Sequence, residues 1–281
     1  MSMTLQQTLH QAQQSGLERI DAQLLLLHVL GRPDAGRAWL LTHDTDMLAP
    51  AQQQAFDALC ARRLAGEPVA YLTGRKEFYG LALQVDARVL DPRPDTETLV
   101  DWALEVLADW PAPRIVDLGT GSGAIALALA HERRDARVWA VDASADALAV
   151  ASDNAQRLGL ALQLAHGSWL QALAPAQVFD AIVTNPPYIA ANDPHLSSLT
   201  HEPLSALASG ADGLDDIRAI IDQAPQRLAR NGWLLIEHGW DQALAVRALL
   251  HDAGFAQVQS RNDLAGIARC TGGCMTDLDR Q

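Results

Sequence analysis

The sequence predicts an α/β protein, in which a mostly parallel β-sheet covered by helices follows a small bundle of helices. From about residue 96 onward, short apolar runs of strand length alternate with helical stretches, a pattern typical of a parallel sheet covered on both faces. The first 75 residues show helical periodicity alone. We therefore expect an N-terminal helical domain at residues 1–75, a β-hairpin linker at 76–95 and a domain containing the sheet at 96–281.

Three helices are expected in the N-terminal domain. Apolar positions recur at helical spacing in residues 4–14 and 20–30, and a glycine follows each run. Pro50 predicts the start of a third helix at 51–65, because proline is favoured in the first turn. The apolar faces of these helices most simply form the core of the bundle. The same domain is also a candidate for recognising a macromolecular substrate.

The linker is expected to form a β-hairpin. Leu81, Leu83 and Val85 occupy alternate positions after Gly80, as in a half-buried strand that follows a tight turn. The proline-rich segment that ends the linker leads into an amphipathic helix at 96–107. This helix is expected to open the second domain.

The second domain alternates strands with helices. Strands are expected at 114–118, 137–141, 162–166, 179–184 and 233–237, and helices at 124–130, 145–158, 213–228 and 242–253. Two further extended segments, at 256–260 and 266–271, are expected to complete the sheet at an edge, with an antiparallel edge strand.

Composition limits the function classes. The chain has 281 residues and an apolar fraction of 49%, which is ample for a buried core. Its net charge of −13 opposes the phosphate neutralisation that supplies most sequence-independent affinity for nucleic acid. The basic residues are scattered singly or in pairs instead of forming a patch. We expect no stable binding to nucleic acid.

Three cysteines are too few for a disulfide scaffold and fit a reducing compartment. Cys270 and Cys274 lack a second pair of ligand residues nearby, so no metal site is expected. The amino terminus has no basic start followed by an apolar core, unlike a secretory signal. The apolar run at 24–30 is too short to cross a bilayer. We therefore expect a cytoplasmic protein without membrane contact.

A glycine-rich turn follows the first predicted strand. The segment Asp117-Leu118-Gly119-Thr120-Gly121-Ser122-Gly123 leads directly into the apolar helix at 124–130. Its three glycines permit a tight turn and let a ligand lie against bare backbone at the start of the helix. Asp142 ends the second strand, where its carboxylate can accept hydrogen bonds from both hydroxyls of a ribose. These features predict a cradle for a nucleoside-containing cofactor.

A nicotinamide dinucleotide is the main alternative cofactor for this cradle. The dinucleotide fingerprint is Gly-x-Gly-x-x-Gly, whereas the third glycine of this chain comes one position earlier. A pyrophosphate also gains nothing from the acidic Asp117, which suits a cationic cofactor. S-adenosylmethionine has a ribose, an adenine, an amino group and a sulfonium, and no phosphate. We therefore expect S-adenosylmethionine as the cofactor.

Asn185-Pro186-Pro187-Tyr188 directly follows the predicted strand at 179–184. The Asn185 amide can accept one N–H of a flat amino group, and the prolines hold the carbonyls of the loop rigid. Tyr188 supplies a π-face on which an amide or a nucleobase can lie. Asn-Pro turns also end strands for purely structural reasons. Together with the cofactor cradle, this loop favours methyl transfer to a planar NH2 group.

Taken together, these two motifs resemble those of the class I amino methyltransferases, and more closely the PrmC/HemK family of release factor glutamine methyltransferases. The segments that carry the narrower resemblance are Tyr71-Leu72-Thr73-Gly74, Glu77-Phe78-Tyr79-Gly80, Pro92-Arg93-Pro94-Asp95-Thr96-Glu97, Asn185-Pro186-Pro187-Tyr188-Ile189, His201-Glu202-Pro203-Leu204-Ser205-Ala206-Leu207 and Leu235-Ile236-Glu237-His238-Gly239. The resemblance extends from about residue 68 to residue 266 and implies a Rossmann-like class I methyltransferase sheet.

The resemblance also implies roles for individual residues. Asp142 would hold the ribose of S-adenosylmethionine, Trp169 would lie against its adenine side, and Asn185 would touch both cofactor and substrate. The contacts to the cofactor would come from Gly119, Thr120, Gly121, Ser122 and Gly123. The substrate would be the glutamine of the Gly-Gly-Gln motif in class I peptide release factors, bound by Asn185, Pro186, Pro187 and Tyr188.

Two other functions fit part of this pattern. An adenine-N6 DNA or RNA methyltransferase would present the same exocyclic NH2 geometry to Asn185, although the charge of the chain argues against nucleic acid. A non-catalytic adapter would not need intact cofactor and acceptor motifs. The chain departs from the family pattern at Ser168, where Asp is frequent, and at Asp91, where an apolar residue is common.

Overall fold

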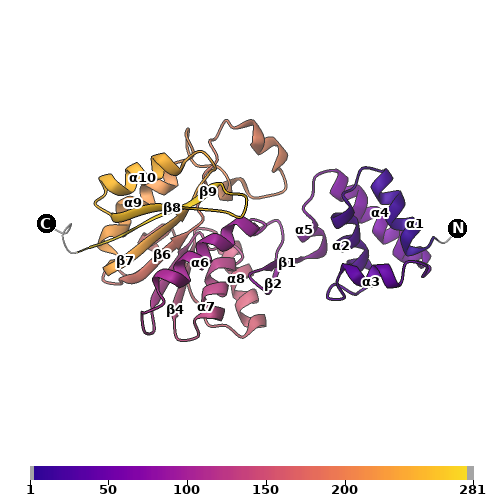
Figure 1. The fold of residues 1–281 in the computed structure, drawn as a ribbon, viewed down its shortest axis with the longest axis horizontal. Helices are drawn as coiled ribbons and strands as arrows, with labels where there is room; N and C mark the ends of the chain where they lie inside the picture. Colours follow the sequence, from indigo (N-terminus) through magenta and orange to yellow (C-terminus); the bar gives the residue numbers. More distant parts are fainter. Residues whose placement is uncertain (1–2, 277–281) are drawn as a thin grey trace. The chain divides into compact units, whose positions relative to one another are not determined.

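The computed structural model describes residues 3–276 and divides the chain into two compact units, Met1–Arg75 and Lys76–Gln281 (Figure 1). The first unit is helical, and the second contains the sheet. Within the described part of the chain, no helix combines the length and the apolar character needed to span a membrane.

The helical unit contains α1 (Leu5–Gln14), α2 (Arg19–Val29), α3 (Arg37–Thr42), α4 (Pro50–Leu64) and α5 (Val69–Thr73). Thr4 caps α1, because its hydroxyl accepts from the Gln7 amide at 3.2 Å and the Gln7 side chain accepts from the Thr4 amide at 3.0 Å. The buried core of the unit includes Leu5, Leu25, Leu26 and Phe56. The three longer helices confirm the expected ones, whereas the short α3 and α5 were not predicted.

A two-stranded sheet opens the second unit, as expected for the linker. Its strands are β1 (Arg75–Phe78) and β2 (Leu81–Gln84). Tyr79 and Gly80 connect them with φ angles of 50° and 74°, the left-handed conformation that a tight two-residue turn requires at both positions. The hairpin is therefore confirmed.

The large sheet has seven strands in the order β5-β4-β3-β6-β7-β9-β8. The strands are β3 (Arg114–Leu118), β4 (Arg137–Asp142), β5 (Gln163–His166), β6 (Phe179–Thr184), β7 (Leu228–Glu237), β8 (Ala256–Asn262) and β9 (Ala268–Cys274). The first five are parallel, and β9 is antiparallel to both β7 and β8. The chain reverses its winding direction between β3 and β6, which is where open α/β sheets bind ligands.

Helices cover both faces of this sheet. Figure 1 shows α6 (Glu97–Val106), α7 (Ala124–Glu132) and α8 (Ala145–Leu158) on one face, and α9 (Asp215–Gln223) and α10 (Ala243–Asp252) on the other. A short helix, η1 (Pro94–Thr96), precedes α6. The mostly parallel sheet with helices on both faces confirms the predicted fold class.

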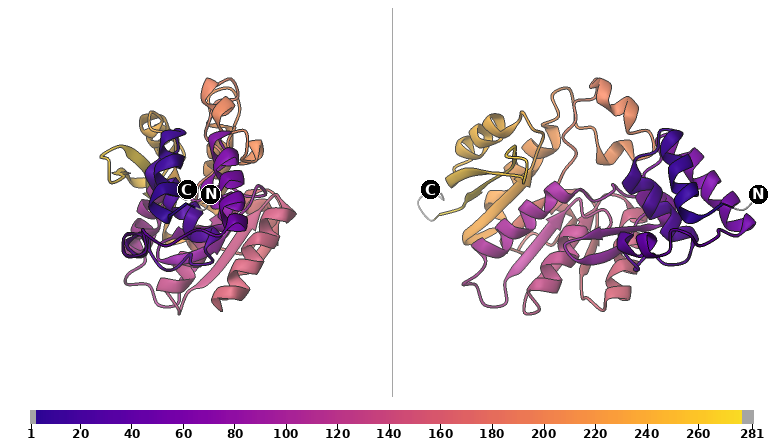
Figure 2. Two further views of the ribbon diagram at one scale, coloured as in Figure 1. Left: turned by 90° about the vertical axis from the view of Figure 1, so that its right-hand side faces the viewer. Right: turned by 45° about the vertical axis from the view of Figure 1, so that its right-hand side comes forward.

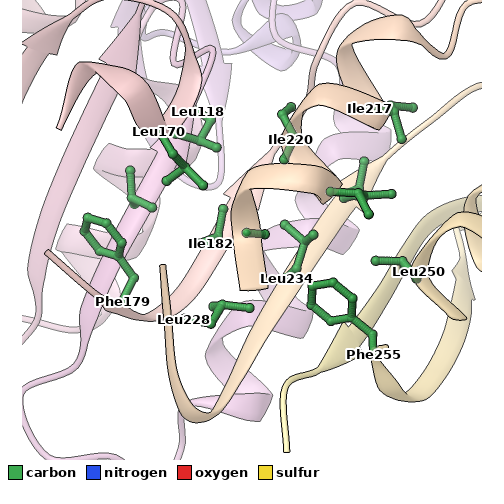
Figure 3. Packing of buried hydrophobic residues seen from close by; sticks show 14 of the residues in the cluster. Leu118, Leu170, Phe179, Ile182, Ile217, Ile220, Leu228, Leu234, Leu250 and Phe255 are labelled. Carbon is green, nitrogen blue, oxygen red and sulfur yellow. The ribbon is translucent and has the colours of Figure 1, made fainter. Parts of the chain in front are cut away.

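The core on the second face joins the central strands to α9 and α10 (Figure 3). Leu118 of β3, Ile182 of β6 and Leu234 of β7 are fully buried there against Ile220 of α9 and Leu250 of α10. This core holds the central strands in register. Figure 2 shows the segment between β6 and α9 as short helical turns that extend beyond the sheet. The loop with Asn185 therefore starts from the end of a strand that is buried at every position.

Two expected boundaries were wrong. The helix expected at 213–228 is the shorter α9, because Gly213 has a left-handed φ of 77° and Pro225 falls in a 3-10 turn after Gln223. The strand expected at 233–237 begins earlier, at Leu228, with an irregularity in its pairing to β6. The antiparallel strand is β9, one position in from the edge, and β8 forms the edge itself.

Candidate active site

Two cavities lie at the carboxyl ends of the parallel strands, both within the second unit. One, of about 390 Å³, contains the glycine-rich turn after β3 and the end of β4. The other, of about 710 Å³, is lined by the loop that follows β6 and by Glu237 at the end of β7. Both volumes are in the usual range for small-molecule sites. Asn185 lines both cavities, together with Leu90 and Ala206.

The glycine-rich turn has a geometry that requires glycine. Gly119, Gly121 and Gly123 have φ angles of 72°, 54° and 83°, a region that other residues rarely adopt. A β-carbon on Gly123 would lie 3.1 Å from the Leu127 side chain and 3.2 Å from that of Ala151, so this glycine allows close packing under the turn. At Gly121 the space around a β-carbon is open. A ligand can therefore approach the backbone at Gly121.

Asp142 connects the end of β4 to this turn. Its Oδ2 accepts from the Gly121 amide at 2.9 Å, and its Oδ1 accepts from the Ser144 amide at 2.8 Å. Each carboxylate oxygen keeps a further lone pair, and the residue lines the smaller cavity. This arrangement leaves acceptors available for the two hydroxyls of a ribose.

Asp117 lies behind the turn and does not line the smaller cavity. Its Oδ2 accepts from the Thr120 hydroxyl at 2.6 Å and from the Ala126 amide at 3.2 Å, so it ties the turn to the start of α7. Burial raises the pKa of Asp117 to about 7, although the Thr120 hydrogen bond lowers it. Its Oδ1 is buried without a hydrogen-bond partner among the described residues. One acceptor atom of this buried carboxyl thus lacks a donor within residues 3–276.

Trp169 forms one wall of the smaller cavity. It has a positive φ of 46°, which is unusual for a bulky residue, and its ring lies against Gly119. The flat ring, the carboxylate of Asp142 and the exposed glycine backbone match the adenine and ribose of a nucleoside. The lining residues include Asp142 and Asp216 as acidic groups and Arg88 as a basic one. These lining residues fit S-adenosylmethionine, which carries positive charge and no phosphate.

Part of the loop that follows β6 lines the larger cavity. Tyr188 and Glu237 line it with Asn185, and charged groups surround them at Arg93 and Arg269. Burial is the main cause that raises the pKa of Tyr188, and the nearby Glu237 carboxylate raises it further. The tyrosine therefore stays neutral and acts as a flat ring with a hydroxyl.

Contacts from two other segments fix the backbone of Tyr188. The Gln242 side-chain amide donates to the Tyr188 carbonyl at 3.0 Å, while its Oε1 accepts from the Gly239 amide at 2.8 Å. A β-carbon at Gly213 would overlap with the same Tyr188 carbonyl. Glycine is therefore required at 213, and the loop has little freedom to move.

A partly buried ion pair joins the segment after the loop to the segment before α6. Arg93 Nη2 donates to both carboxylate oxygens of Glu202, at 2.8 and 2.7 Å. Glu202 Oε1 also accepts from the Asp91 amide at 3.2 Å. The Glu202 side chain is only 2% exposed, so its charge depends on these donors. Both segments belong to the family pattern, but the sequence does not predict the Arg93–Glu202 ion pair.

The structure brings most of the expected site residues together. Gly119, Gly121, Asp142, Trp169, Asn185 and Pro187 line the smaller cavity, and Asn185 and Tyr188 line the larger one. Asp117, Thr120, Ser122, Gly123 and Pro186 line neither cavity. The sequence did not predict four further residues that line the larger cavity: Arg93, Glu237, Gln242 and Arg269. They come together through contacts between segments far apart in the chain, which a linear motif does not reveal.

The cysteine pair lies on one strand. Cys270 and Cys274 are both in β9, buried and free. Among residues 3–276, no three metal-ligating side chains of the His, Cys, Asp or Glu type gather in one place.

Two protein families match the chain. Residues 4–74 match the family described as PrmC N-terminal domain, and residues 96–210 match the Methyltransferase small domain. Release factor glutamine methyltransferases are similar over almost the full length. That of Bordetella pertussis is 53% identical over 92% of this chain and 95% of its own, and that of Escherichia coli is 46% identical over 95% and 96%.

Solved structures with a similar fold are also methyltransferases. The hMettl16 catalytic domain in complex with a 3′UTR hairpin has a TM-score of 0.58 at 17% identity, covering 71% of this chain and 77% of its own. The T. Thermophilus 16S rRNA methyltransferase RsmC, in complex with AdoMet and guanosine, has a TM-score of 0.55 at 20% identity, covering 71% and 49%. At these identities the likeness concerns the fold.

The fold and the two cavities define a class I methyltransferase that uses S-adenosylmethionine. Within that class, the chain belongs to the family of release factor glutamine methyltransferases.

Proposed function

We propose that this enzyme transfers a methyl group from S-adenosylmethionine to the side-chain amide nitrogen (N5) of a glutamine, the one in the Gly-Gly-Gln motif of class I peptide chain release factors. The observation that carries the proposal is that Asn185 lines both cavities. A cofactor in the smaller cavity and an acceptor in the larger one would meet at this side chain. Family membership supports glutamine as the acceptor.

The smaller cavity would hold the cofactor through groups that the chain already aims at it. Asp142 would accept from the ribose hydroxyls, Trp169 would lie along the adenine, and Gly119 and Gly121 would let the ligand contact the backbone. Asp117 would act from behind the turn, where its hydrogen bonds to Thr120 and to the start of α7 would hold the turn in shape for the cationic cofactor. Thr120, Ser122 and Gly123 would shape the turn itself.

The larger cavity would orient the glutamine amide. When bound, S-adenosylmethionine supplies an electrophilic methyl group. An amide nitrogen is a poor nucleophile, because its lone pair is delocalised into the carbonyl, so orientation must account for much of the rate. Asn185 Oδ1 and the Pro186 carbonyl would accept the two N–H groups and stabilise positive charge that develops on nitrogen. Tyr188 and Pro187 would hold the amide plane.

The two units would divide the work. The unit at Met1–Arg75 would recognise the release factor, since the site chemistry lies in the other unit. The enzyme would act in the cytoplasm, where translation terminates. Its net charge of −13 supports a protein acceptor over stable binding to nucleic acid.

A transfer assay with labelled S-adenosylmethionine tests this function. The purified chain is mixed with a class I release factor, with the same factor carrying Gln→Ala in its Gly-Gly-Gln motif, or with tRNA or duplex DNA. We expect label on the unaltered factor alone. Label on the Gln→Ala factor, or on nucleic acid in its place, would show that the acceptor is different.

A further inference from the structure

The buried carboxyl group of Glu237 lies beside Asn185 at the edge where the two cavities meet. Thr184 of β6 pairs in parallel with Ile236 of β7, so Asn185 and Glu237 are the next residues of neighbouring strands. Glu237 is 1% exposed and lines the acceptor cavity. Burying a carboxylate is costly unless it has donors, so this residue needs a structural or functional reason.

Thr96 completes a chain of polar contacts with these two residues. Asn185 Nδ2 donates to the Thr96 hydroxyl oxygen at 3.3 Å. The Thr96 hydroxyl and the Asn185 amide also face the Glu237 carboxyl, and both favour its ionised form by lowering its pKa. Thr96, in η1, is itself 4% exposed, so water does not replace these contacts easily. The three side chains form one buried network.

An ionised Glu237 carboxylate favours one orientation of the two side chains beside it. A carboxylate only accepts, so the Thr96 hydroxyl turns its hydrogen toward Glu237, and its oxygen is then free to accept from the Asn185 NH2 group. Glu237 Oε2 has no hydrogen-bond partner among the described residues, so the carboxylate retains unused capacity to accept N–H groups. Turning the Asn185 amide over would place an oxygen against this negative charge. The NH2 end is therefore held toward Glu237.

We propose that Glu237, together with Thr96, is a positioning residue that locks the Asn185 amide so that its Oδ1 faces the acceptor glutamine. This inference rests on the proposed function, since it gives Asn185 Oδ1 the role of accepting an N–H of the substrate amide. With Glu237 neutral, the carboxyl can donate to Thr96, and Thr96 can then donate to Asn185. The locked orientation is lost in that state.

The inference predicts a pH dependence. Burial raises the pKa of Glu237 to about 7, while the Thr96 hydroxyl and Arg269 lower this pKa and Asp95 raises it further. Tyr188 and Cys270 also interact with this carboxyl, and burial raises the pKa of each. Both therefore stay neutral near pH 7. The active orientation requires ionised Glu237, so turnover should rise with pH up to about 7 and then level off.

Matched variants of the full chain test the proposal. Glu237→Gln and Thr96→Val keep the shape of each side chain, and both should lower kcat on the release factor by about 10- to 100-fold, as expected for losing a hydrogen bond to a charged group. KM and cofactor affinity should stay within about threefold, because neither residue forms the glycine-rich cradle. The Glu237→Gln variant should also lose the rise of kcat with pH.

Asp180→Asn is the control for a buried carboxylate changed to an amide. Asp180 is 5% exposed and lies near the opposite end of β6, where it accepts from the Arg114 amide at 2.7 Å. We expect this variant to lose stability with unchanged kcat. Equal loss of kcat in Asp180→Asn and Glu237→Gln would overturn the proposal, as would wild-type kcat in Glu237→Gln.

A measurement independent of turnover separates this inference from the proposed function. In ¹⁵N spectra, the side-chain NH2 resonance of Asn185 should shift with pH with a midpoint near that of Glu237, and this shift should vanish in Glu237→Gln. An Asn185 resonance that is indifferent to pH and to the variant would overturn the inference. A wild-type enzyme that leaves release factors unmodified would instead overturn the proposed function, while the resonance would still report on Glu237.

Discussion

The Trp169 ring lies directly over the backbone of Gly119. A β-carbon on Gly119 would come within 3.3 Å of ring atom Cζ3, closer than nearly all real contacts of this kind. Gly119 also has a φ of 72°, so a larger residue is strained there in any case. Both residues line the smaller cavity, so this contact forms part of its wall.

Gly119→Ala should therefore impair cofactor binding. Because the added methyl group displaces the Trp169 ring, we expect affinity for S-adenosylmethionine to fall by about tenfold or more, a loss of about 1.4 kcal/mol. Isothermal titration calorimetry measures this directly. Gly159→Ala is the matched control, since Gly159 has a similar φ of 63° but open space around its β-carbon. Equal affinity in both variants would disprove the contact's role.

Asn185→Ala should separate chemistry from cofactor binding. Removing the amide deletes the acceptor proposed for the glutamine N–H, whereas the ribose and adenine contacts remain. We expect kcat to fall by about 10³-fold, similar to losses seen when a transition-state hydrogen-bond partner is removed. Cofactor affinity by calorimetry should stay within about threefold. A parallel fall of turnover and of cofactor affinity would contradict this role.

Arg93→Ala should destabilise the protein. The change leaves the carboxylate of Glu202, with a side chain 2% exposed, without its main donor. We expect a loss of about 2–3 kcal/mol in the free energy of unfolding, at the low end for buried pairs because Arg93 is partly exposed. Chemical denaturation gives the value. Arg218→Ala, which breaks an exposed pair with Asp212, should leave the free energy of unfolding nearly unchanged. Similar losses in the two variants would refute the importance of burial.

Asp117→Asn should change how stability depends on pH. Burial raises the pKa of Asp117 to about 7, so the folded state holds its proton more tightly than the unfolded state. Its contribution to stability is complete below the unfolded pKa and is lost as pH rises through about 7. We expect the unfolding free energy of the variant to fall less between about pH 4 and pH 8 than that of the wild type.

Asp135→Asn should change the pH dependence of the unfolding free energy in the opposite direction. Hydrogen bonding from Arg133 holds the pKa of Asp135 well below its usual range, so its contribution is lost as pH falls. Denaturation curves at several pH values distinguish the two variants. An unchanged pH slope in Asp117→Asn would rule out the proton as the cause.

The sequence predicted the central elements well where pattern and packing agree. The strands β3 and β6 and the helix α8 have the expected bounds, because each is a short apolar or amphipathic run with clear ends. The end of α9 was missed because Pro225 sits in a 3-10 turn that directly follows the helix. Local patterns do not show where such a turn takes over.

Other features depend on contacts that a linear sequence does not contain. The glycines of β9 resemble a turn, yet a β-carbon on Gly272 would crowd the Leu234 carbonyl and the Trp102 ring, so glycine allows close strand packing. Glu237 likewise became a candidate site residue only because the register of β6 with β7 places it beside Asn185. The motifs predicted both the glycine-rich turn and the loop with Asn185, and the register of the sheet added Glu237 beside that loop.

The wall of Leu90, Asn185 and Ala206 between the two cavities has a consequence for the order of events. Under the proposed function, the methyl donor and the acceptor would occupy separate cavities, whose shared lining among the described residues is these three side chains. We therefore expect the spent cofactor to exchange while the release factor is bound. Initial-rate kinetics should then show that either ligand can bind first.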